Sequence, residues 1–135
     1  MKKVIAIILN VMIIVSMLSV AFAEPDASTY ASRVISQTTV AIRCTGGKVY
    51  GGGNIKTVAT ADKVGISSIA LYEKNGTSWT KLTSASGKYG YGTDDYSYTI
   101  SAPATEGKTY KVTVTFYGKI GSLTATHTQS QTSTY

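Results

Sequence analysis

Cysteine is nearly absent from the sequence, with Cys44 the only one among 135 residues. A lone cysteine cannot close a disulfide within the chain, so a domain of this size must draw its stability from a packed core. Free cysteine is among the most frequently buried residue types, which favours a buried role for Cys44. Pairing with a second chain is the alternative. Either way, a disulfide-stapled scaffold is excluded.

Histidine is equally scarce, and this leaves little for catalysis. His127 is the only histidine, and the residues nearest to it in sequence are threonines and serines. A hydrolytic triad needs an imidazole beside a nucleophile and an orienting acid. No flanking signature supports a thiolate pair of Cys44 with His127. We therefore predict a protein that is not an enzyme and that holds no cofactor.

Acidic residues are few, and Asp94 and Asp95 form the one adjacent pair. Calcium takes about six to eight oxygen ligands, often with loop carbonyls among them, and this loop offers some of them. Adjacent carboxylates seldom point at one ion, and no Asp-x-Asp-x-Asp spacing is present. The sequence therefore favours a solvated turn and no metal.

Runs of like charge are missing too. After residue 23 the chain carries eleven basic and seven acidic residues, a net charge of +4, and the lysines are scattered singly. A nucleic-acid footprint needs basic side chains gathered on one face, so nucleic acid is not expected as a partner. A weak attraction to anionic cell-wall polymers is the alternative to a charge that serves solubility alone.

The one long apolar run lies at the N-terminus. Lys2 and Lys3 precede an apolar stretch over residues 4–18, and Ala21-Phe22-Ala23 has the small-x-small pattern of a signal-peptidase site. The sequence predicts a signal peptide over residues 1–23 and a secreted, extracellular product. Retention as an anchor is the alternative, because about 18 apolar residues can span a bilayer. No lipid-acceptor cysteine or sorting tail follows, so no stable membrane anchor is expected after cleavage.

Helix signals are weak, and a single turn within residues 26–33 is the only one expected. From residue 33 onward Thr, Val, Ile, Tyr and Gly dominate short alternating runs between turn residues, as in β-sandwiches. We predict one antiparallel, immunoglobulin-like β-sandwich of about seven strands over residues 32–128. A lead-in segment at 24–31 precedes it and a polar tail at 129–135 follows. The expected strands span residues 34–43, 48–50, 55–61, 67–74, 77–82, 96–100, 108–117 and 122–128.

The alternation is clearest in residues 108–117, where apolar side chains occupy every second position. Such a pattern is typical of a half-buried antiparallel strand. The residues expected to face the core are Val34, Ile42, Ile55, Ile69, Leu71, Ile100, Val112, Val114 and Phe116.

Two glycine motifs mark places where the strands turn or break. Asn75-Gly76 directly follows the expected strand at 67–74 and is a strong hairpin signal. Gly51-Gly52-Gly53 interrupts what would otherwise be one run over residues 48–61, and it predicts a bulge, a kink or a break between two strands. A phosphate-cradling loop is not favoured there, because no Lys-Ser/Thr pair or helix start follows.

Three segments, residues 60–69, 71–79 and 107–117, resemble a family of small secreted proteins of Gram-positive, Clostridia-type bacteria. With the signal sequence they cover roughly half of the chain, and the Asn-Gly-x-x-Trp and Gly-Lys-x-Tyr spacings are the most specific part. The resemblance implies a single immunoglobulin- or fibronectin-type sandwich and brings no known activity or catalytic residue. Cys44 and the triple glycine depart from the family's pattern.

Tyrosine is abundant, with ten residues. Tyr110 starts the strand at 108–117 just after a turn, where sandwich domains place a corner tyrosine whose hydroxyl bonds to the backbone. We therefore expect a structural role for it. Four other tyrosines crowd residues 89–98, and tyrosine with glycine gives rigid contact surfaces on adaptable loops. A plain role as strand residues is the alternative.

These observations lead to two functional hypotheses. The first is a non-catalytic extracellular binding or adhesion module for a glycan or protein partner, with a contact surface of Tyr89, Tyr91, Asp94, Asp95 and Trp79. The second is a structural protein that assembles with itself or coats the envelope, since exposed edge strands invite pairing. A small secreted toxin is a third, weaker reading. The sequence leaves the oligomeric state open.

Overall fold

The computed structural model describes the backbone of residues 26–28 and the whole of residues 32–135. The predicted signal peptide and most of the lead-in segment lie outside the described residues. In that part of the chain there is no helix, and so none that would cross a membrane. The strands are β1 (Asp26–Ser28), β2 (Ile35–Thr45), β3 (Lys48–Ala61), β4 (Lys63–Asn75), β5 (Ser78–Gly90), β6 (Thr93–Pro103), β7 (Thr109–Ile120) and β8 (Leu123–Thr134).

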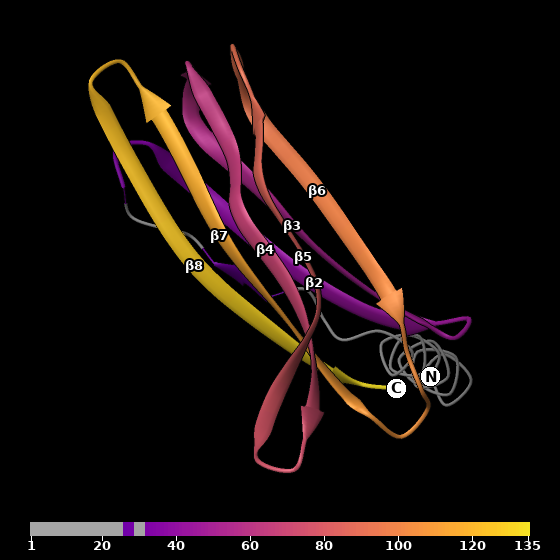
Figure 1. Ribbon diagram of the computed structural model, residues 1–135. Coiled ribbons are helices and arrows are strands. Elements are labelled where there is room, and N and C mark those ends of the chain that lie inside the picture. The colour runs from indigo at the N-terminus through magenta and orange to yellow at the C-terminus, as the bar shows by residue number, and fades with distance from the viewer. Residues whose placement is uncertain (1–25, 29–31) are drawn as a thin grey trace, which may run out of the picture.

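The strands form two sheets that pack face to face (Figure 1). Sheet A has the order β1-β2-β3-β6 and sheet B the order β5-β4-β7-β8. All pairs of neighbouring strands are antiparallel. In immunoglobulin lettering, β2, β3 and β6 occupy places A, B and E, while β5, β4, β7 and β8 occupy places C′, C, F and G. The predicted all-β, immunoglobulin-like sandwich is confirmed.

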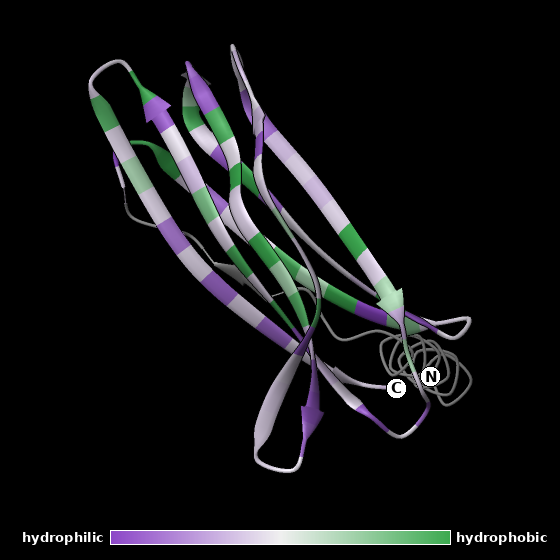
Figure 2. Cartoon of the chain, in the orientation of Figure 1, coloured by the Kyte–Doolittle hydropathy of each residue, from purple (hydrophilic) through white to green (hydrophobic). Residues whose placement is uncertain are grey.

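The core lies between the sheets and is built by alternation along each strand. In β7 every second residue is buried, from Tyr110 to Gly118, while the residues between them are half-buried on the outer face. Figure 2 shows the matching bands of apolar colour on β4 and β7. Full burial of an aliphatic or phenyl side chain stabilises the fold by about 1.5–3 kcal/mol. Of the residues expected inside, all are buried except Ile100, which packs against the core from edge strand β6.

The triple glycine lies within one continuous strand, so the predicted bulge, kink or break is wrong. Gly51, Gly52 and Gly53 pair in unbroken register with both β2 and β6. Gly51 and Gly53 face the core, and a Cβ at Gly53 would lie 2.9 Å from the Phe116 ring. The missing side chains let β3 approach sheet B closely. The motif therefore serves packing between sheets rather than a turn.

Three edge strands are longer than the sequence indicated, and β6 spans Thr93–Pro103 instead of residues 96–100. β5 continues to Gly90 beyond the expected end at 82, and β8 continues to Thr134 through the segment expected to be a polar tail. Both strands carry rows of Ser, Thr or Gln without the apolar alternation that marks a half-buried strand, and pairing with β4 and β7 holds them in place. The helical turn expected within residues 26–33 is also wrong at its start, because Asp26–Ser28 pairs with β2.

The β4–β5 hairpin forms where the sequence predicted it, with the turn shifted by one residue. Asn75 pairs with Ser78, so Gly76 and Thr77 make the two-residue loop, and Gly76 has a φ of 64°. Glycine at the first loop position is typical of a type II′ turn. The hairpin extends beyond the ends of its neighbouring strands (Figure 1).

Tyr110 is fully buried at the start of β7, the place of strand F. The backbone N–H of Thr105, five residues upstream, donates to its hydroxyl at 2.7 Å. The hydroxyl in turn donates to the Glu73 carboxylate at 3.1 Å. Burial is the main cause that raises the pKa of Tyr110 above its ordinary value. These bonds are of the kind expected for a corner tyrosine, and they tie the β6–β7 connection to sheet B.

Candidate functional site

The structure separates the residues predicted to contact a ligand. Tyr89 lies on the outer face of sheet B, opposite Gly65 of β4. Asp95 lies on the outer face of sheet A, where its carboxylate accepts a hydrogen bond from Asn54 Nδ2 at 2.5 Å. These two faces point away from each other, so Tyr89 and Asp95 do not share one contact surface.

Tyr91 and Asp94 lie where the chain crosses from one sheet to the other. Tyr91 is 70% exposed in the β5–β6 connection. Asp94 is exposed at the start of β6, and its backbone carbonyl accepts a hydrogen bond from Thr57 Oγ1 at 3.3 Å. A polar hollow of about 150 Å³ lies beside the two adjacent carboxylates. Among the residues that the structure describes, no three His, Cys, Asp or Glu side chains converge as metal ligands.

Trp79 shares the outer face of sheet B with Tyr89 but lies at its other end. It pairs with Lys74 beside the β4–β5 turn. Trp79 and Tyr89 are ten positions apart along β5, which is about 30 Å at the rise of an extended strand. The two predicted contact residues on this face therefore belong to two separate clusters.

The first cluster surrounds Gly65. Tyr89 of β5 and Tyr117 of β7 are both paired with this glycine across β4. Their rings meet edge to face with centroids 5.9 Å apart, and Lys63 Nζ lies 4.1 Å from the Tyr89 centroid. A Cβ at Gly65 would lie 2.2 Å from the Lys88 carbonyl oxygen and 2.8 Å from the Tyr89 Cα, so the backbone of β5 leaves room only for glycine here. Because glycine has no side chain, the rings of Tyr89 and Tyr117 can meet across β4.

The second cluster is centred on Lys111. This residue pairs with Tyr72 of β4, and its Nζ lies 5.2 Å from the Tyr72 ring centroid and 4.5 Å from that of Trp79. All three side chains are half-buried. Lysine–aromatic contacts of this kind are worth about 0.5–1 kcal/mol at exposed sites, so they hold the rings in place without burying them.

Between the clusters the outer face of sheet B is a floor of small side chains. Lys111 and Tyr117 are six positions apart along β7, which is about 20 Å of extended strand. Hydroxyl groups pair across β7 and β8, with Thr113 to Ser130 at 2.8 Å and Thr115 to Thr128 at 3.0 Å. In the register of the sheet the floor consists of Ser68, Ala70, Ser84, Ser86, Thr113, Thr115, Thr128 and Ser130.

The same face gathers positive charge. Lysines scattered singly along the sequence fall on it for two reasons. Lys111 and Lys119 of β7 are an even number of positions apart. Lys63 and Lys74 of β4 reach the same face because the register with β7 shifts between Ile66 and Ser68. Lys63 and Lys119 are directly opposite each other, an arrangement that costs stability. Of the described acidic side chains, none lies on this face: Glu73 turns inward to Tyr110, and the others lie in turns or on β6. The lysines of this face are Lys63, Lys74, Lys81, Lys111 and Lys119.

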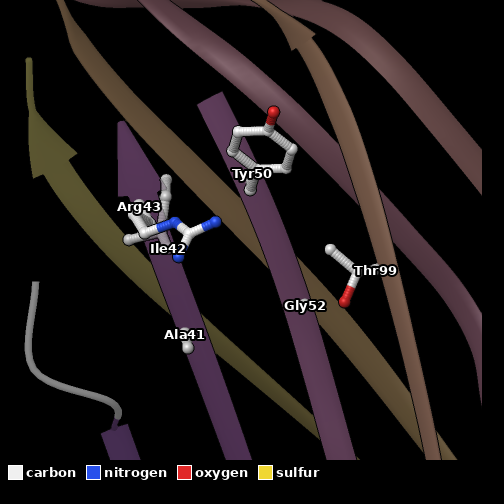
Figure 3. Close-up of a pocket in the computed structure, with 6 residues that line it drawn as sticks. All are labelled: Ala41, Ile42, Arg43, Tyr50, Gly52 and Thr99. Atoms are coloured by element: carbon white, nitrogen blue, oxygen red, sulfur yellow. The ribbon is translucent and has the colours of Figure 1, made fainter. Parts of the chain in front are cut away.

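The outer face of sheet A carries a different feature, a shallow hollow of about 290 Å³ above Gly52 (Figure 3). Ala41, Gly52 and Thr99 are neighbours across the three strands, so the middle of the face lacks large side chains. The Arg43 guanidinium lies 5.2 Å from the Tyr50 ring centroid at one end. The volume falls just below the range of about 300–1,000 Å³ typical of small-molecule sites.

The thiol and the imidazole considered for nucleophilic chemistry are not brought together. Cys44 is buried at the end of β2, where its thiol is hydrogen-bonded to Ser133 of β8, and burial raises its pKa. His127 lies six residues away from Ser133 along β8, about 20 Å of extended strand. A thiolate pair of these residues is therefore not formed.

Sequence reasoning found one member of each cluster, Tyr89 and Trp79, and missed their neighbours. The alternation along β7 puts Lys111 and Tyr117 on the outer face, together with Thr113 and Thr115. The pairing of that face with Tyr72 and Gly65 depends on the β4–β7 register, which a single sequence does not give.

The chain matches no family model, no curated protein and no solved structure.

Proposed function

We propose that this chain is a secreted, non-catalytic binding module whose outer face of sheet B binds an acidic polysaccharide. The observation that carries the proposal is the arrangement of that face, with an aromatic–lysine cluster at each end of a floor of hydroxyl-bearing side chains. Secretion is inferred from the N-terminal sequence pattern.

The aromatic side chains supply contact area for sugar rings. Tyr and Trp present large, rigid surfaces at a low cost in conformational entropy. Tyr89 and Trp79 lie on one face, and their clusters are far enough apart for an extended chain, rather than a single sugar, to contact both. The Thr and Ser hydroxyls between them offer donors and acceptors to sugar hydroxyls along the way.

The lysines favour an anionic polymer over a neutral one. An acid group placed between Lys63 and Lys119 would relieve the repulsion between two like charges that pair directly. Arginine, which fits phosphate and carboxylate groups alike, does not lie on this face among the described residues. We prefer carboxylated sugars because the hydroxyl-bearing floor suits a sugar chain, and nucleic acid is the competitor to be excluded.

A protein partner fits this face less well. Interfaces between proteins have a desolvated core that is depleted in charged residues. The large apolar side chains exposed in the described part of the chain are scattered, at Val58, Leu82, Tyr91 and Leu123, and form no such core. A floor of paired hydroxyls between lysines suits a hydrated, polar ligand.

The test is depletion of the purified protein from solution by insoluble polysaccharides. We expect saturable binding to immobilised polygalacturonate and little to cellulose or chitin. The double variant Trp79→Ala/Tyr89→Ala should bind at least about tenfold more weakly, the loss of about 1.4 kcal/mol or more. Tyr50→Ala is the matched control, because Tyr50 also sits beside a cation but on sheet A.

Binding should also weaken as salt rises, since exposed charges are screened within about 8 Å at physiological ionic strength. The proposal would be refuted if no acidic polysaccharide were bound, if Tyr50→Ala and the double variant lost binding equally, or if single-stranded DNA were bound more tightly than polygalacturonate.

A further inference from the structure

The tip of the β4–β5 hairpin has an exposed asparagine directly before a glycine. Asn75 is the last residue of β4, and Gly76 is the first of the two loop residues. Both are exposed to solvent. Asn75 and Ser78 form the last pair of the ladder, so the backbone nitrogen of Gly76 belongs to the loop. The polysaccharide proposal uses neither Asn75 nor Gly76.

An asparagine followed by glycine can lose its side-chain amide without an enzyme. The backbone nitrogen of Gly76 attacks the carboxamide carbon of Asn75, and a bond forms between these two atoms. The bond from that carbon to the side-chain nitrogen breaks, and this nitrogen leaves as ammonia after taking up the proton of the Gly76 amide through solvent. Water, the only co-reactant, then opens the cyclic imide at either of its carbonyl carbons. The product is aspartate or isoaspartate, and nothing is oxidised or reduced.

The local structure favours this reaction at the hairpin tip. Glycine has no side chain that would shield its nitrogen. The extended backbone of Asn75 must rotate before that nitrogen reaches the carboxamide carbon. This rotation breaks only bonds of the tip, from Asn75 Nδ2 to Thr80 Oγ1 at 2.6 Å and from the Ser78 hydroxyl to the Asn75 carbonyl at 3.0 Å. The tip extends beyond the neighbouring strands (Figure 1) and residues 74–78 are exposed, so it opens locally at little cost in free energy.

We propose that Asn75 is a site of spontaneous deamidation, and that the carboxylate it gains weakens the binding of an acidic polysaccharide at the cluster centred on Lys111. The conversion depends only on the hairpin tip and is independent of the proposed function. The effect on binding rests on that function. Because no enzyme is required, the protein changes with age from a form that binds more tightly to one that binds more weakly.

The new charge lies beside this cluster. Lys74 and Trp79 form the pair next to Asn75 and Ser78, and the Trp79 ring contacts Lys111. Successive residues of a strand are about 3.4 Å apart, well within the screening length of about 8 Å at physiological ionic strength. A carboxylate at position 75 therefore offsets the charge of Lys74 and repels an acidic polymer. Isoaspartate also adds a methylene group to the backbone of a tight turn, which disturbs the pairing of Trp79.

Asn54 is a control for the reaction within the same molecule. It lies in the middle of β3, which pairs with a strand on each side. Its side-chain amide donates to Asp95 Oδ1 and to Ser97 Oγ. The next residue is Ile55, whose β-branched side chain crowds the backbone nitrogen. Asn54 and Asn75 are the two asparagines among the described residues, and we expect only Asn75 to convert.

The test is peptide mass mapping of the purified protein after incubation at mildly alkaline pH. Conversion should become faster as the pH rises, because the backbone nitrogen attacks after it loses its proton. The tryptic peptide with residue 75 should gain the mass difference between OH and NH₂ and separate into aspartate and isoaspartate forms on chromatography. The peptide with Asn54 should keep its mass. Asn75→Gln should block the reaction, since glutamine closes its larger ring far more slowly.

The effect on binding is measured with polygalacturonate as the probe. Asn75→Asp should bind about two- to fivefold more weakly than wild type, the size expected for one exposed charge interaction. Gln37→Glu is the matched control, because it makes the same amide-to-acid change at an exposed position of β2 on sheet A. It should leave binding unchanged.

Equal conversion of Asn54 and Asn75 would overturn the proposal. So would an intact amide at position 75 under conditions in which a synthetic peptide of residues 72–81 loses its own. The binding part is overturned if Asn75→Asp binds as tightly as wild type, or if Gln37→Glu weakens binding equally. A wild-type protein that binds no polygalacturonate refutes the proposed function and the binding part with it, while the mass of the peptide with residue 75 still decides the conversion.

Discussion

At the scale of single residues, the glycines of β3 show how closely the two sheets approach. Gly51 and Gly53 stand where a Cβ would lie under 3.0 Å from side chains of sheet B, while Gly52 faces outward. One strand thus serves two purposes, since its inner glycines allow tight packing and its outer glycine forms the floor of the hollow on sheet A.

Gly53→Ala should therefore destabilise the protein. The added methyl group meets the buried side chains of Phe116 and Val114, and overpacking of a core costs about 1–3 kcal/mol. Gly52→Ala is the control. Its methyl group meets the exposed Thr99 side chain and lies 3.2 Å from the Tyr98 carbonyl oxygen. We expect a smaller loss than for Gly53→Ala, because no buried side chain is displaced and replacing glycine in a strand regains about 0.5–1 kcal/mol. Urea denaturation measures both, and equal effects would contradict the packing argument.

The raised pKa of Tyr110 predicts that the protein loses stability at alkaline pH. The pKa of this tyrosine is raised in the folded state, chiefly by burial, so the folded protein holds this proton more tightly than the unfolded chain does. The corresponding stability is complete below the ordinary pKa of about 10 and is lost as the pH rises through the folded value.

The variant Tyr110→Phe lacks this proton and leaves the Thr105 N–H and the Glu73 carboxylate without their partner. We expect it to be less stable by about 1–3 kcal/mol at neutral pH. The difference from wild type should shrink above pH 10, as followed by urea midpoints across the alkaline range. A difference that stayed constant up to pH 11 would contradict this account.

At the scale of elements, the hairpin between β4 and β5 depends on one backbone conformation. Gly76 has a φ of 64°, which other residues adopt only with strain. Gly76→Ala should cost about 1 kcal/mol, since a left-handed conformation disfavours a Cβ. Thr77→Ala in the same loop should be nearly neutral. Thermal unfolding tests the pair, and a Gly76→Ala variant as stable as wild type would show that the turn tolerates another conformation.

The elements that the sequence predicted well are those whose burial alternates. The sequence predicted both the position of β7 and the residues of β7 that face the core, because every second residue is apolar. The ends of β5 and β8 were missed, because these edge strands bury few side chains and their hydroxyl rows resemble loop composition. The triple glycine was misread for a related reason, since a single sequence does not show what a strand packs against.

The candidate site was predictable only in part. Trp79 and Tyr89 stood out by residue type, and the structure puts both on the outer face of sheet B. Asp95 was grouped with Tyr89 because it is near in sequence, but the chain changes sheets between them and the two side chains lie on opposite faces. In a sandwich, residues that are close in sequence need not share a face when the chain between them crosses from one sheet to the other.

At the scale of the whole molecule, the two outer faces differ in charge and in shape. The outer face of sheet B is basic, with rings at both ends, while that of sheet A mixes charges and has a hollow beside Tyr50. Because of this asymmetry, we propose the outer face of sheet B as the binding surface. Substitutions on the outer face of sheet A then serve as controls in the same molecule. Trp79, the only tryptophan, lies in one of the clusters and serves as a built-in reporter.

The most direct measurement is an NMR titration of the ¹⁵N-labelled protein with oligosaccharides of polygalacturonate. The account predicts shifts of the Trp79 indole N–H and of amides around Lys63, Tyr89 and Lys111, with amides around Tyr50 unmoved. Shifts confined to the hollow on sheet A, or a saturating titration that leaves Trp79 and Tyr89 unchanged, would contradict it.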